Sequence, residues 1–358
     1  MASLNHTSHN SRRLAWIDIC KGFVILLVLF NHSGFQPCSS MQQESIFSAL
    51  VTFIHNMYSA SFMPVFYFLS GYTYKAHPHN ISSRFKRILP HYFSWGTLCL
   101  IITWSFLYIT GELASGFSVP LLGLLYSRCS IYPAGSELFQ PIWPIDAAPL
   151  WFLTSLLTSY VLFSIIQKTP YRKLIIICYV ILTWALSFCP ILLPWSIDTA
   201  FAGALFIYAG NQAKETNLFS SDKMRLQRIF LLILPLYIAV AQLNGPLNMS
   251  VRQYGTFQAF SPIIFLLIGI TGSIVYCGIS QALEKTKLAT SMTQLGKKSL
   301  LLLCSHSLCF HAIDCIFPKT EAYTPILSIV KIITAIFFAF TFDKLIDITT
   351  KKRQAITS

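Results

Sequence analysis

The sequence predicts an all-α, polytopic membrane protein with about ten transmembrane helices. Its 358 residues are 54% hydrophobic and only 11% charged, whereas soluble domains carry about 25% charged residues. Apolar runs long enough to cross a bilayer recur along the whole chain. These runs are continuous rather than alternating with period two, which argues against a transmembrane β-barrel.

The apolar runs divide the chain into ten expected spans. They cover residues 14–35, 46–72, 91–110, 148–167, 174–193, 197–213, 229–243, 260–280, 299–317 and 325–342. One membrane domain, residues 14–345, therefore lies between an N-terminal tail (1–13) and a C-terminal tail (346–358). The first run is too long for a cleavable signal and no A-x-A site follows it, so we expect a first span whose N-terminus is inside.

The distribution of basic residues orients these spans. With the N-terminus inside, 22 of the 26 Lys and Arg residues fall in the tails, in the inner loops or near the inner end of the first span. Only Arg128, Arg252 and Lys319 fall in outer loops, and Lys331 lies within the last span. This bias follows the positive-inside rule. It predicts two cytoplasmic termini and explains the net charge of +13 without a nucleic-acid partner.

The longest connection, residues 111–147, is expected on the outer side. It is rich in proline, contains Trp143 and carries an apolar stretch at 117–125. Loops of this length in compact proteins are often functional. The chain shows no internal repeat, which weakens the interpretation as a transporter, because many carriers consist of duplicated halves.

The first span carries three ionisable residues on one face. Lys21 and His32 are eleven residues apart, which is three helical turns with about 20° of offset, and Asp18 lies three residues before Lys21. The helical rise places His32 roughly 16 Å above Lys21. Such residues in a membrane segment usually face a protein interior or a wet cavity and usually have a function. We expect a charged anchor near the inner surface and a proton acceptor near the outer surface.

Each residue of this face also has a structural alternative. His32 can take up and return a proton near neutral pH, or it can bind a carbonyl at the helix end. Asp18 and Lys21 on its face and Asn31 beside it favour catalysis. Lys21 can meet a phosphate or extend its ammonium group to the inner surface. Asp18 can pair with Lys21 at i,i+3, which leaves Lys21 charged.

A second basic cluster, Arg84, Lys86 and Arg87, falls in the inner loop before Pro90. Arg84 and Arg87 share a face if that loop is helical. The simplest interpretation is ordinary positive-inside charge. The functional interpretation is an anion clamp for a phosphorylated substrate on the cytoplasmic side.

Two further sites carry polar or aromatic candidates. The ninth span holds His306, His311 and Asp314. His311 and Asp314 are neighbours at i,i+3, but nothing supplies a clear third ligand beside them, so no metal is expected. His306 is better explained as a polar residue that lines a cavity. Trp151, near the outer surface, either belongs to an aromatic belt or stacks on a sugar ring.

Six motifs occur in a fixed order along almost the whole chain. They are Trp16-Ile17-Asp18-Ile19-Cys20-Lys21-Gly22 with Asn31-His32, Met63 to Tyr72, Arg84 to Arg87 with Pro90 and Tyr92, Leu150-Trp151-Phe152-Leu153, Asp198 to Gly210, and Leu295 to Leu300 followed by His306. In this order they resemble the acyltransferase-3 family of integral-membrane O-acyltransferases. The first motif is closest to the branch that is similar to fucose O-acetyltransferases, although Asn31 replaces a usual Gly and Phe62 stands where that branch often has His.

The resemblance implies a membrane-bound O-acetyltransferase. It implies transfer of an acyl group, usually acetyl, from cytoplasmic acetyl-CoA to a sugar hydroxyl of a surface or exported polysaccharide, such as an O-antigen, an exopolysaccharide or a lipid-linked precursor. Acetyl-CoA is then a donor substrate and no bound cofactor is expected. His32 would be the catalytic histidine, and Lys21, Arg84 and Arg87 would neutralise the CoA phosphates. The expected site therefore consists of His32 and Asp18 in catalysis and, in substrate binding, of Lys21, Asn31, Arg84, Arg87, Trp151 and His306.

Two other functions fit the residues alone. A polytopic glycan transporter or flippase would use the polar face as a translocation path. A glycan polymerase or ligase would use the long outer loop and a polyprenyl-linked sugar. Neither would release a thiol from acetyl-CoA. All three functions predict a multi-pass protein of the cell inner membrane with the lipid bilayer and a glycan as partners, and none predicts the oligomeric state.

Overall fold

The described part of the chain is helical, as the sequence predicts. The computed structural model describes residues 14–34, 46–75, 80–111, 116–143, 145–219, 223–250, 252, 254–317 and 324–357. Within these ranges there is no strand, and Ser130 and Pro141 form an isolated antiparallel bridge. The expectation of an all-α membrane protein is confirmed.

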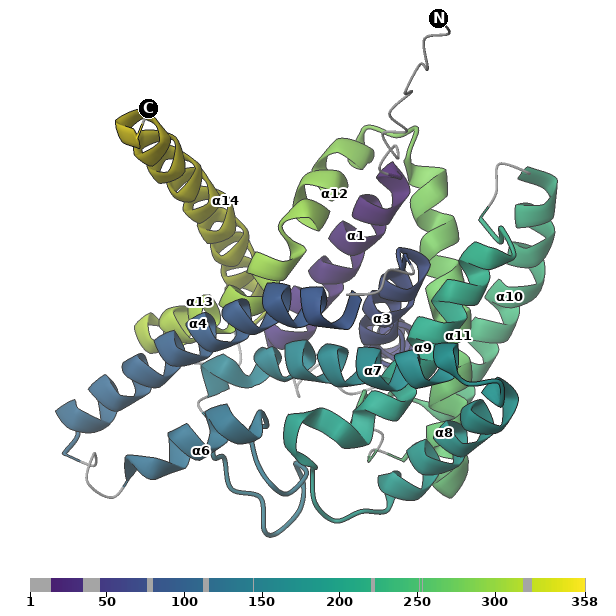
Figure 1. Cartoon of the computed structure of the whole chain (residues 1–358), viewed down its shortest axis with the longest axis horizontal. Coiled ribbons are helices and arrows are strands. Elements are labelled where there is room, and N and C mark those ends of the chain that lie inside the picture. Colours follow the sequence, from purple (N-terminus) through teal and green to yellow (C-terminus); the bar gives the residue numbers. More distant parts are fainter. Residues whose placement is uncertain are drawn as a thin grey trace, which may run out of the picture.

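Figure 1 shows the helices of the described part of the chain. In chain order they are α1 (Ala15–His32), α2 (Ile46–Ser59), α3 (Phe62–Tyr72), α4 (Asn80–Ile109), α6 (Ser118–Tyr126), the 3-10 helix η2 (Ile145–Leu150), α7 (Trp151–Lys168), α8 (Arg172–Ser187), η3 (Pro194–Ser196), α9 (Ile197–Glu215), α10 (Lys223–Asn244), η4 (Gln258–Phe260), α11 (Ser261–Leu283), α12 (Leu288–Lys297), α13 (Ser299–Ile316) and α14 (Thr324–Thr357).

Five helical segments are long and apolar enough to cross a membrane. They are Ala15–His32, Ile81–Ile109, Gln258–Leu283, Ser299–Ile316 and Pro325–Ile346. The multi-pass character is therefore confirmed, while the count of ten spans and the cytoplasmic termini stay predictions. The N-terminal end of α1 and the C-terminal end of α14 both lie on the upper side in Figure 1.

The structure departs from the expected spans in three places. The run 46–72 breaks into α2 and α3 at residues 60–61, because the ring of Pro64 would clash with the carbonyl of residue 60 in a continuous helix. The basic segment expected in a loop forms the start of α4, so Arg84 and Arg87 share a helix face. Helix α14 continues to Thr357, through most of the expected C-terminal tail.

The expected inner loop 281–298 contains α12, which packs closely against α1. A Cβ atom on Gly22 would lie 1.9 Å from the backbone oxygen of Met292, and one on Gly296 would lie 1.8 Å from that of Asp18. Only glycine at both positions allows two helix backbones to approach so closely. The backbone N–H of Trp16 also donates to Oε1 of Glu284 at 2.9 Å. These contacts fix how α1 is rotated, and therefore where its polar face points.

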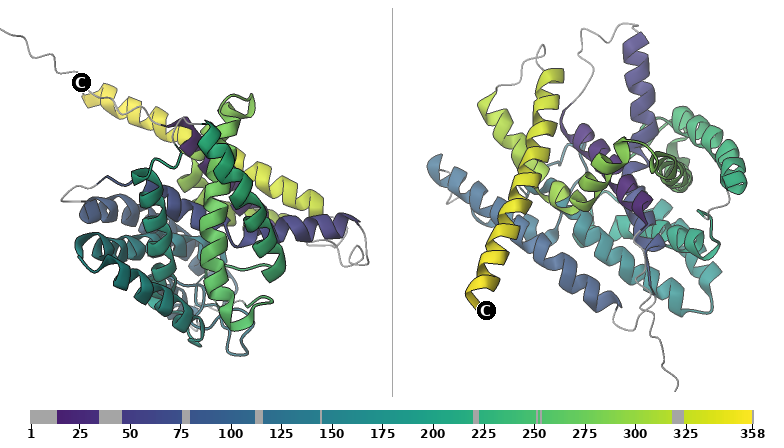
Figure 2. Two further views of the ribbon diagram at one scale, coloured as in Figure 1. Left: turned by 90° about the vertical axis from the view of Figure 1, so that its right-hand side faces the viewer. Right: turned by 90° about the horizontal axis from the view of Figure 1, so that it is seen from above.

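Helix α1 lies inside the helical assembly rather than at its edge. It packs against α3, α11, α12 and α13, and Figure 1 shows it between these neighbours. Its buried residues include Ile19, Cys20, Val24 and Ile25, each at most 1% exposed. Helix α14 extends away from the body and, seen from above in Figure 2, crosses α4 and α13.

Candidate active site

The polar face of α1 opens into two separate cavities. Asp18 and Lys21 line a cavity of about 940 Å³ at the N-terminal end of the helix. Asn31 and His32 line a cavity of about 260 Å³ at its C-terminal end. We call these the inner and the outer cavity. The face therefore points into the protein at both ends, as expected for ionisable residues on a membrane helix.

The inner cavity is strongly basic. Besides Lys21 it is lined by Arg84 and Arg87 of α4, and by Lys75 and Lys214. Among its described lining residues, Asp18 is the one carboxylate that faces these five cations. The surplus of positive charge makes this cavity suited to a polyanion such as a phosphorylated molecule.

Two basic groups of the inner cavity, Arg84 and Lys214, have contacts that hold them in place. The Arg84 guanidinium carbon lies 3.7 Å from the ring centroid of Tyr160 and 5.6 Å from that of Tyr74, a cation–π arrangement. The Lys214 ammonium donates to the backbone oxygen of Tyr74 at 2.5 Å. The sequence analysis did not single out Lys75 or Lys214, because each is one of many positive charges on the expected inner side.

The outer cavity combines His32 with residues that lie far away in the sequence. Trp151 comes from α7, and Arg128 and Cys129 come from the expected outer loop. The remaining described lining residues are apolar or neutral; they are Val28, Asn31, Phe62, Met63, Pro149, Leu192, Asn248, Met249, Ser250 and Leu303. The long outer loop thus contributes directly to the site.

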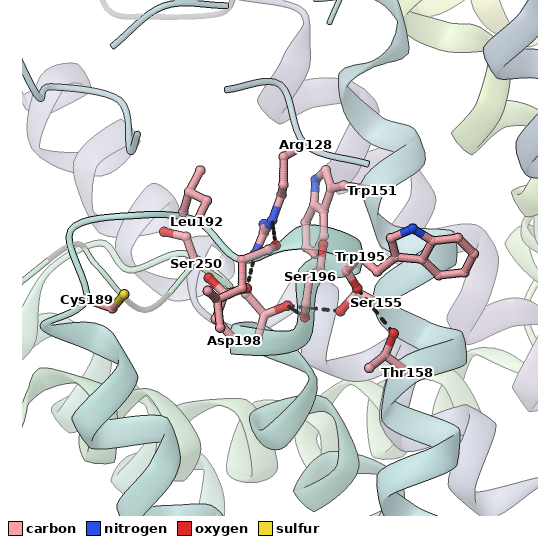
Figure 3. A network of polar contacts seen from close by, with 12 residues as sticks. Arg128, Trp151, Ser155, Thr158, Cys189, Leu192, Trp195, Ser196, Asp198 and Ser250 are labelled. Carbon is pink, nitrogen blue, oxygen red and sulfur yellow. Dashed lines mark hydrogen bonds and ion pairs between the residues drawn. The ribbon is translucent and has the colours of Figure 1, made fainter. Parts of the chain in front are cut away.

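A buried ion-pair network, the Arg128–Asp198–Arg252 triad, adjoins the outer cavity. Figure 3 labels Arg128 and Asp198 of this network. Nη2 of Arg128 bonds one carboxylate oxygen of Asp198, and Nη1 of Arg252 bonds the other at 2.5 Å. The three side chains are 7%, 1% and 5% exposed, in the order Arg128, Asp198, Arg252. Asp198 lies in the first turn of α9, where the helix dipole favours a negative charge.

The triad was not predicted from the sequence, although the charge pattern singles out its members. Arg128 and Arg252 are two of the three basic residues in the expected outer loops, and Asp198 is a carboxylate within an apolar span. Charges that disobey the positive-inside rule need a structural or functional reason. These exceptions mark Arg128, Arg252 and Asp198 as residues that need an explanation, but they do not show that the three contact one another.

His306 lies against His32 instead of lining either cavity. It is fully buried, and its ring centroid is 5.2 Å from that of His32 and 5.5 Å from that of Phe310. Its Nδ1 is 2.8 Å from the backbone oxygen of Leu302. Because a carbonyl only accepts, Nδ1 carries the proton and Nε2 is an acceptor, which has no hydrogen-bond partner within the described part of the chain.

A family model described as an acyltransferase domain matches residues 14–343. The chain belongs to the acyltransferase-3 family. It is therefore a membrane acyltransferase, an enzyme that transfers acyl groups other than aminoacyl groups. The match covers both cavities, the triad and all of the expected site residues. No curated protein and no solved structure matches the chain.

The acyltransferase does not bring Asp18 and His32 together. Asp18 is 2% exposed and lines the inner cavity beside Lys21. The fourteen residues between it and His32 correspond to roughly 21 Å of helical rise. Asp18 is therefore too distant to assist His32 directly. Asp18 instead lines the same cavity as the basic groups Lys21, Arg84 and Arg87.

The end of α1 in the acyltransferase is held by the last helix. Lys331 of α14 donates to the backbone oxygen of Ser33 at 3.3 Å and pairs with Asp314 of α13 at 2.7 Å. Ser33 directly follows His32, so this contact fixes the helix end that carries the imidazole. Asp314, considered above as a metal ligand, is thus part of an ion pair.

The thiol of Cys129 also lines the outer cavity of the acyltransferase. Burial raises the pKa of this thiol, and the nearby Arg128 charge only partly opposes the effect. A thiol with a raised pKa holds little thiolate at neutral pH and is a weak nucleophile. Among the groups that line this cavity, His32 is the better candidate to handle a proton or an acyl group.

Proposed function

We propose that this acyltransferase moves an acetyl group from cytoplasmic acetyl-CoA to a sugar hydroxyl of a surface or exported polysaccharide. One observation carries the proposal. A basic cavity and a histidine-containing cavity open at the two ends of one face of α1. An enzyme that joins a polyanionic donor inside to an acceptor outside needs this arrangement.

In this proposal the donor enters the inner cavity. Lys21, Arg84 and Arg87 bind the CoA phosphates, with Lys75 and Lys214 adding positive charge. Arg84 and Arg87 can bind phosphate oxygens in a bidentate manner that lysine cannot. Asp18 orients Lys21 and takes no part in the chemistry.

The two cavities lie close enough for one donor molecule to reach both. Leu300 and Leu303 are three residues apart on α13 and line the inner and the outer cavity, respectively. In the first turn of α7, Phe152 lines the inner cavity and Trp151 the outer one. Residues within about one helical turn of each other, roughly 5 Å along the axis, thus line the two sides of the partition between the cavities. The pantetheine arm would cross it and present the thioester to His32.

His32 can promote the transfer by either of two routes. In the first, His32 takes the proton of the acceptor hydroxyl as its oxygen attacks the thioester carbonyl. The tetrahedral intermediate then breaks its C–S bond, the CoA thiolate leaves, and the imidazolium returns the proton to it. In the second, His32 takes the acetyl group from CoA and passes it to the hydroxyl. Both routes yield an acetyl ester and free CoA.

His306 acts as a positioning residue in this proposal. Its Nδ1 is held by the Leu302 carbonyl, so its Nε2 offers a fixed acceptor next to the His32 ring. An N–H of His32 directed to that acceptor would leave the other His32 nitrogen free for the substrate. Such a hydrogen bond would select the His32 tautomer that a general base requires.

The acceptor occupies the outer cavity. Trp151 offers an aromatic face for a sugar ring, and Asn31 offers an amide for its hydroxyls. The acceptor is a glycan at the outer face, such as an O-antigen, an exopolysaccharide or a lipid-linked precursor. The enzyme would then reside in the cell inner membrane.

The test measures acetyl transfer by the purified enzyme in lipid nanodiscs. The enzyme is given acetyl-CoA and a glycan extract, and both free thiol and acetyl ester are quantified. His32→Ala should abolish both products while the amount of membrane-inserted protein stays normal. His311→Ala, at an exposed histidine of α13 that lines neither cavity, serves as the matched control. Normal ester formation by His32→Ala, or glycan transport without thiol release, would refute the proposal.

A further inference from the structure

The triad beside the outer cavity carries an unbalanced positive charge. Two guanidinium groups share the single carboxylate of Asp198, which leaves a net charge of +1 in a buried location. A buried charge is expensive unless a counter-charge or hydrogen bonds satisfy it. The two arginines differ in whether they have N–H donors that could bind another anion.

Arg252 is satisfied by the protein itself. Its Nε donates to the backbone oxygen of Cys189 at 3.0 Å and its Nη2 to that of Ile191 at 2.8 Å. Its Nη1 bonds both Asp198 and the backbone oxygen of Ser250. Arg252 is also not among the lining residues of the outer cavity. Its role is therefore structural.

Arg128 differs from Arg252, because it lines the outer cavity and its Nη1 group has no hydrogen-bond partner among the described residues. Its Nε donates to the backbone oxygen of Leu193 at 3.3 Å, and its Nη2 bonds Asp198. Its Nη1, which carries two of the five N–H donors of a guanidinium, bonds no residue in the described ranges. The guanidinium carbon lies 5.8 Å from the Trp151 ring centroid, beside the ring (Figure 3).

The cavity has the size and lining for one acidic sugar. About 260 Å³ is just below the roughly 300–1,000 Å³ of pockets for drug-sized ligands. No carboxylate occurs among its described lining residues. A carboxylate entering it would balance the extra charge and could accept an Nη1 proton in a charge-assisted hydrogen bond.

We propose that the outer cavity selects a carboxylate-bearing sugar, such as a uronic acid, as the acetyl acceptor. Arg128 binds the carboxylate, Trp151 supports the sugar ring and His32 meets one of its hydroxyls. This inference rests on the proposed acetyl transfer and deepens it. The fixed positions of Arg128 and His32 would also restrict which hydroxyl is acetylated.

The first test compares matched acceptors with the wild-type enzyme in nanodiscs. Methyl glucuronide is compared with methyl glucoside, and methyl galacturonide with methyl galactoside, by mass spectrometry of the acetyl ester. The loss of a charge-assisted hydrogen bond predicts a kcat/KM for each uronide at least about tenfold above that of its neutral partner. Equal values would overturn the inference while leaving acetyl transfer intact. Preference for a glucosyl phosphate over the uronides would overturn it as well.

Binding to His32→Ala separates the two proposals, because this variant should not react. Thermal stabilisation by methyl glucuronide, without stabilisation by methyl glucoside, supports an acidic-sugar site even if the wild-type enzyme transfers nothing. Failure of all glycosides both to bind and to react would overturn the inference.

Variants of Arg128 test whether this residue causes the preference for uronides over neutral glycosides. Arg128→Gln should bring the uronide-to-neutral ratio of kcat/KM close to one, mainly through a higher KM for the uronide. Arg252→Gln is the matched comparison: it breaks the other half of the same ion pair outside the cavity lining. It removes the surplus charge but leaves Arg128 in the cavity, so it should lower the ratio less than Arg128→Gln does. An unchanged ratio in Arg128→Gln would overturn the assignment. If that variant does not fold, Arg128→Lys must still reduce the ratio, because lysine lacks the planar fork.

Discussion

At the scale of single residues, the site depends on the contact between His32 and His306. The sequence predicted both residues as candidates but not their contact. His32 could be singled out because it shares a face with Lys21 on an apolar helix. His306 was found as a candidate, but its contact could not be predicted, because it lies 274 residues away on α13. Only the fold shows that its ring meets that of His32 and that its Nδ1 is held by Leu302.

Replacing His306 tests the positioning role. His306→Phe should lower kcat by roughly 10–100-fold with little change in the KM for acetyl-CoA, because a misplaced general base loses part of a contribution of about 10²–10⁴-fold. His306→Gln, which can still offer an acceptor, should recover part of the lost kcat. Steady-state kinetics on both variants provide the measurement. Equal loss in the two variants, or a change in KM alone, would contradict the role.

Charge removal in the inner cavity tests donor binding. Lys21→Ala, Arg84→Ala and Arg87→Ala should each lower kcat/KM for acetyl-CoA by roughly 10–100-fold, because a hydrogen bond to a charged group contributes about 1.5–3 kcal/mol. Lys86→Ala is the control, since Lys86 is exposed on the same helix and does not line the cavity. Unchanged kinetic parameters for Lys21→Ala would remove its anchoring role.

Replacing Cys129 should leave the acetyl-transfer activity unchanged. Because burial raises the pKa of its thiol, the thiol stays protonated at neutral pH and should carry no acyl group. Cys129→Ser should therefore retain kcat within about twofold, as measured by ester formation. Trapping of an acetyl thioester on Cys129 would contradict this account of the outer cavity.

At the scale of helices, the sequence predicted the apolar segments better than their ends. Pro64 gave a local reason for the break between α2 and α3. The segment around Arg84 was instead expected to be an inner loop, and a helix there was only an alternative. Helix α12 was assigned to a loop because its residues are polar on one side. Its packing against α1 depends on Gly22 and Gly296, which come together only in three dimensions.

The α1–α12 contact can be tested at one glycine. Gly22→Ala would place a methyl group 1.9 Å from the backbone oxygen of Met292, so the helices must separate and the face carrying Lys21 must shift. The midpoint of thermal unfolding in detergent should fall by several degrees, as expected for a loss of about 1–3 kcal/mol. Gly116→Ala is the control, because the nearest atoms there belong to the end of the Leu107 side chain. Equal stability of the two variants would show that the close packing is unimportant.

At the scale of the whole molecule, the distribution of Lys and Arg predicted the orientation of the chain in the membrane. It did not predict which segments come together at the site. The bias of Lys and Arg predicted an inner and an outer side, and the basic cavity contains residues from the predicted inner side. The triad could not be derived in the same way. It links the outer loop, the start of α9 and the segment before α11, and such contacts depend on how these segments fold together.

Removing the shared carboxylate tests the triad as a link between these segments. Asp198→Asn leaves two buried guanidinium groups without their counter-charge, which should cost about 3–5 kcal/mol. Asp343→Asn breaks the ion pair with Lys298. The Asp343 side chain is 46% exposed, so this change should cost about 1 kcal/mol or less. Thermal unfolding of both variants provides the comparison. A smaller effect for Asp198→Asn than for Asp343→Asn would show that the triad does not hold the segments together.

The most direct measurement uses proteoliposomes in which the enzyme has one orientation and neither substrate crosses the membrane. Acetyl-CoA is supplied on one side and the glycan on the other, and the acetyl ester is quantified. We predict ester formation only when acetyl-CoA faces the inner cavity and the glycan faces the outer cavity. Ester formation only when both substrates are on the same side would contradict transfer along α1.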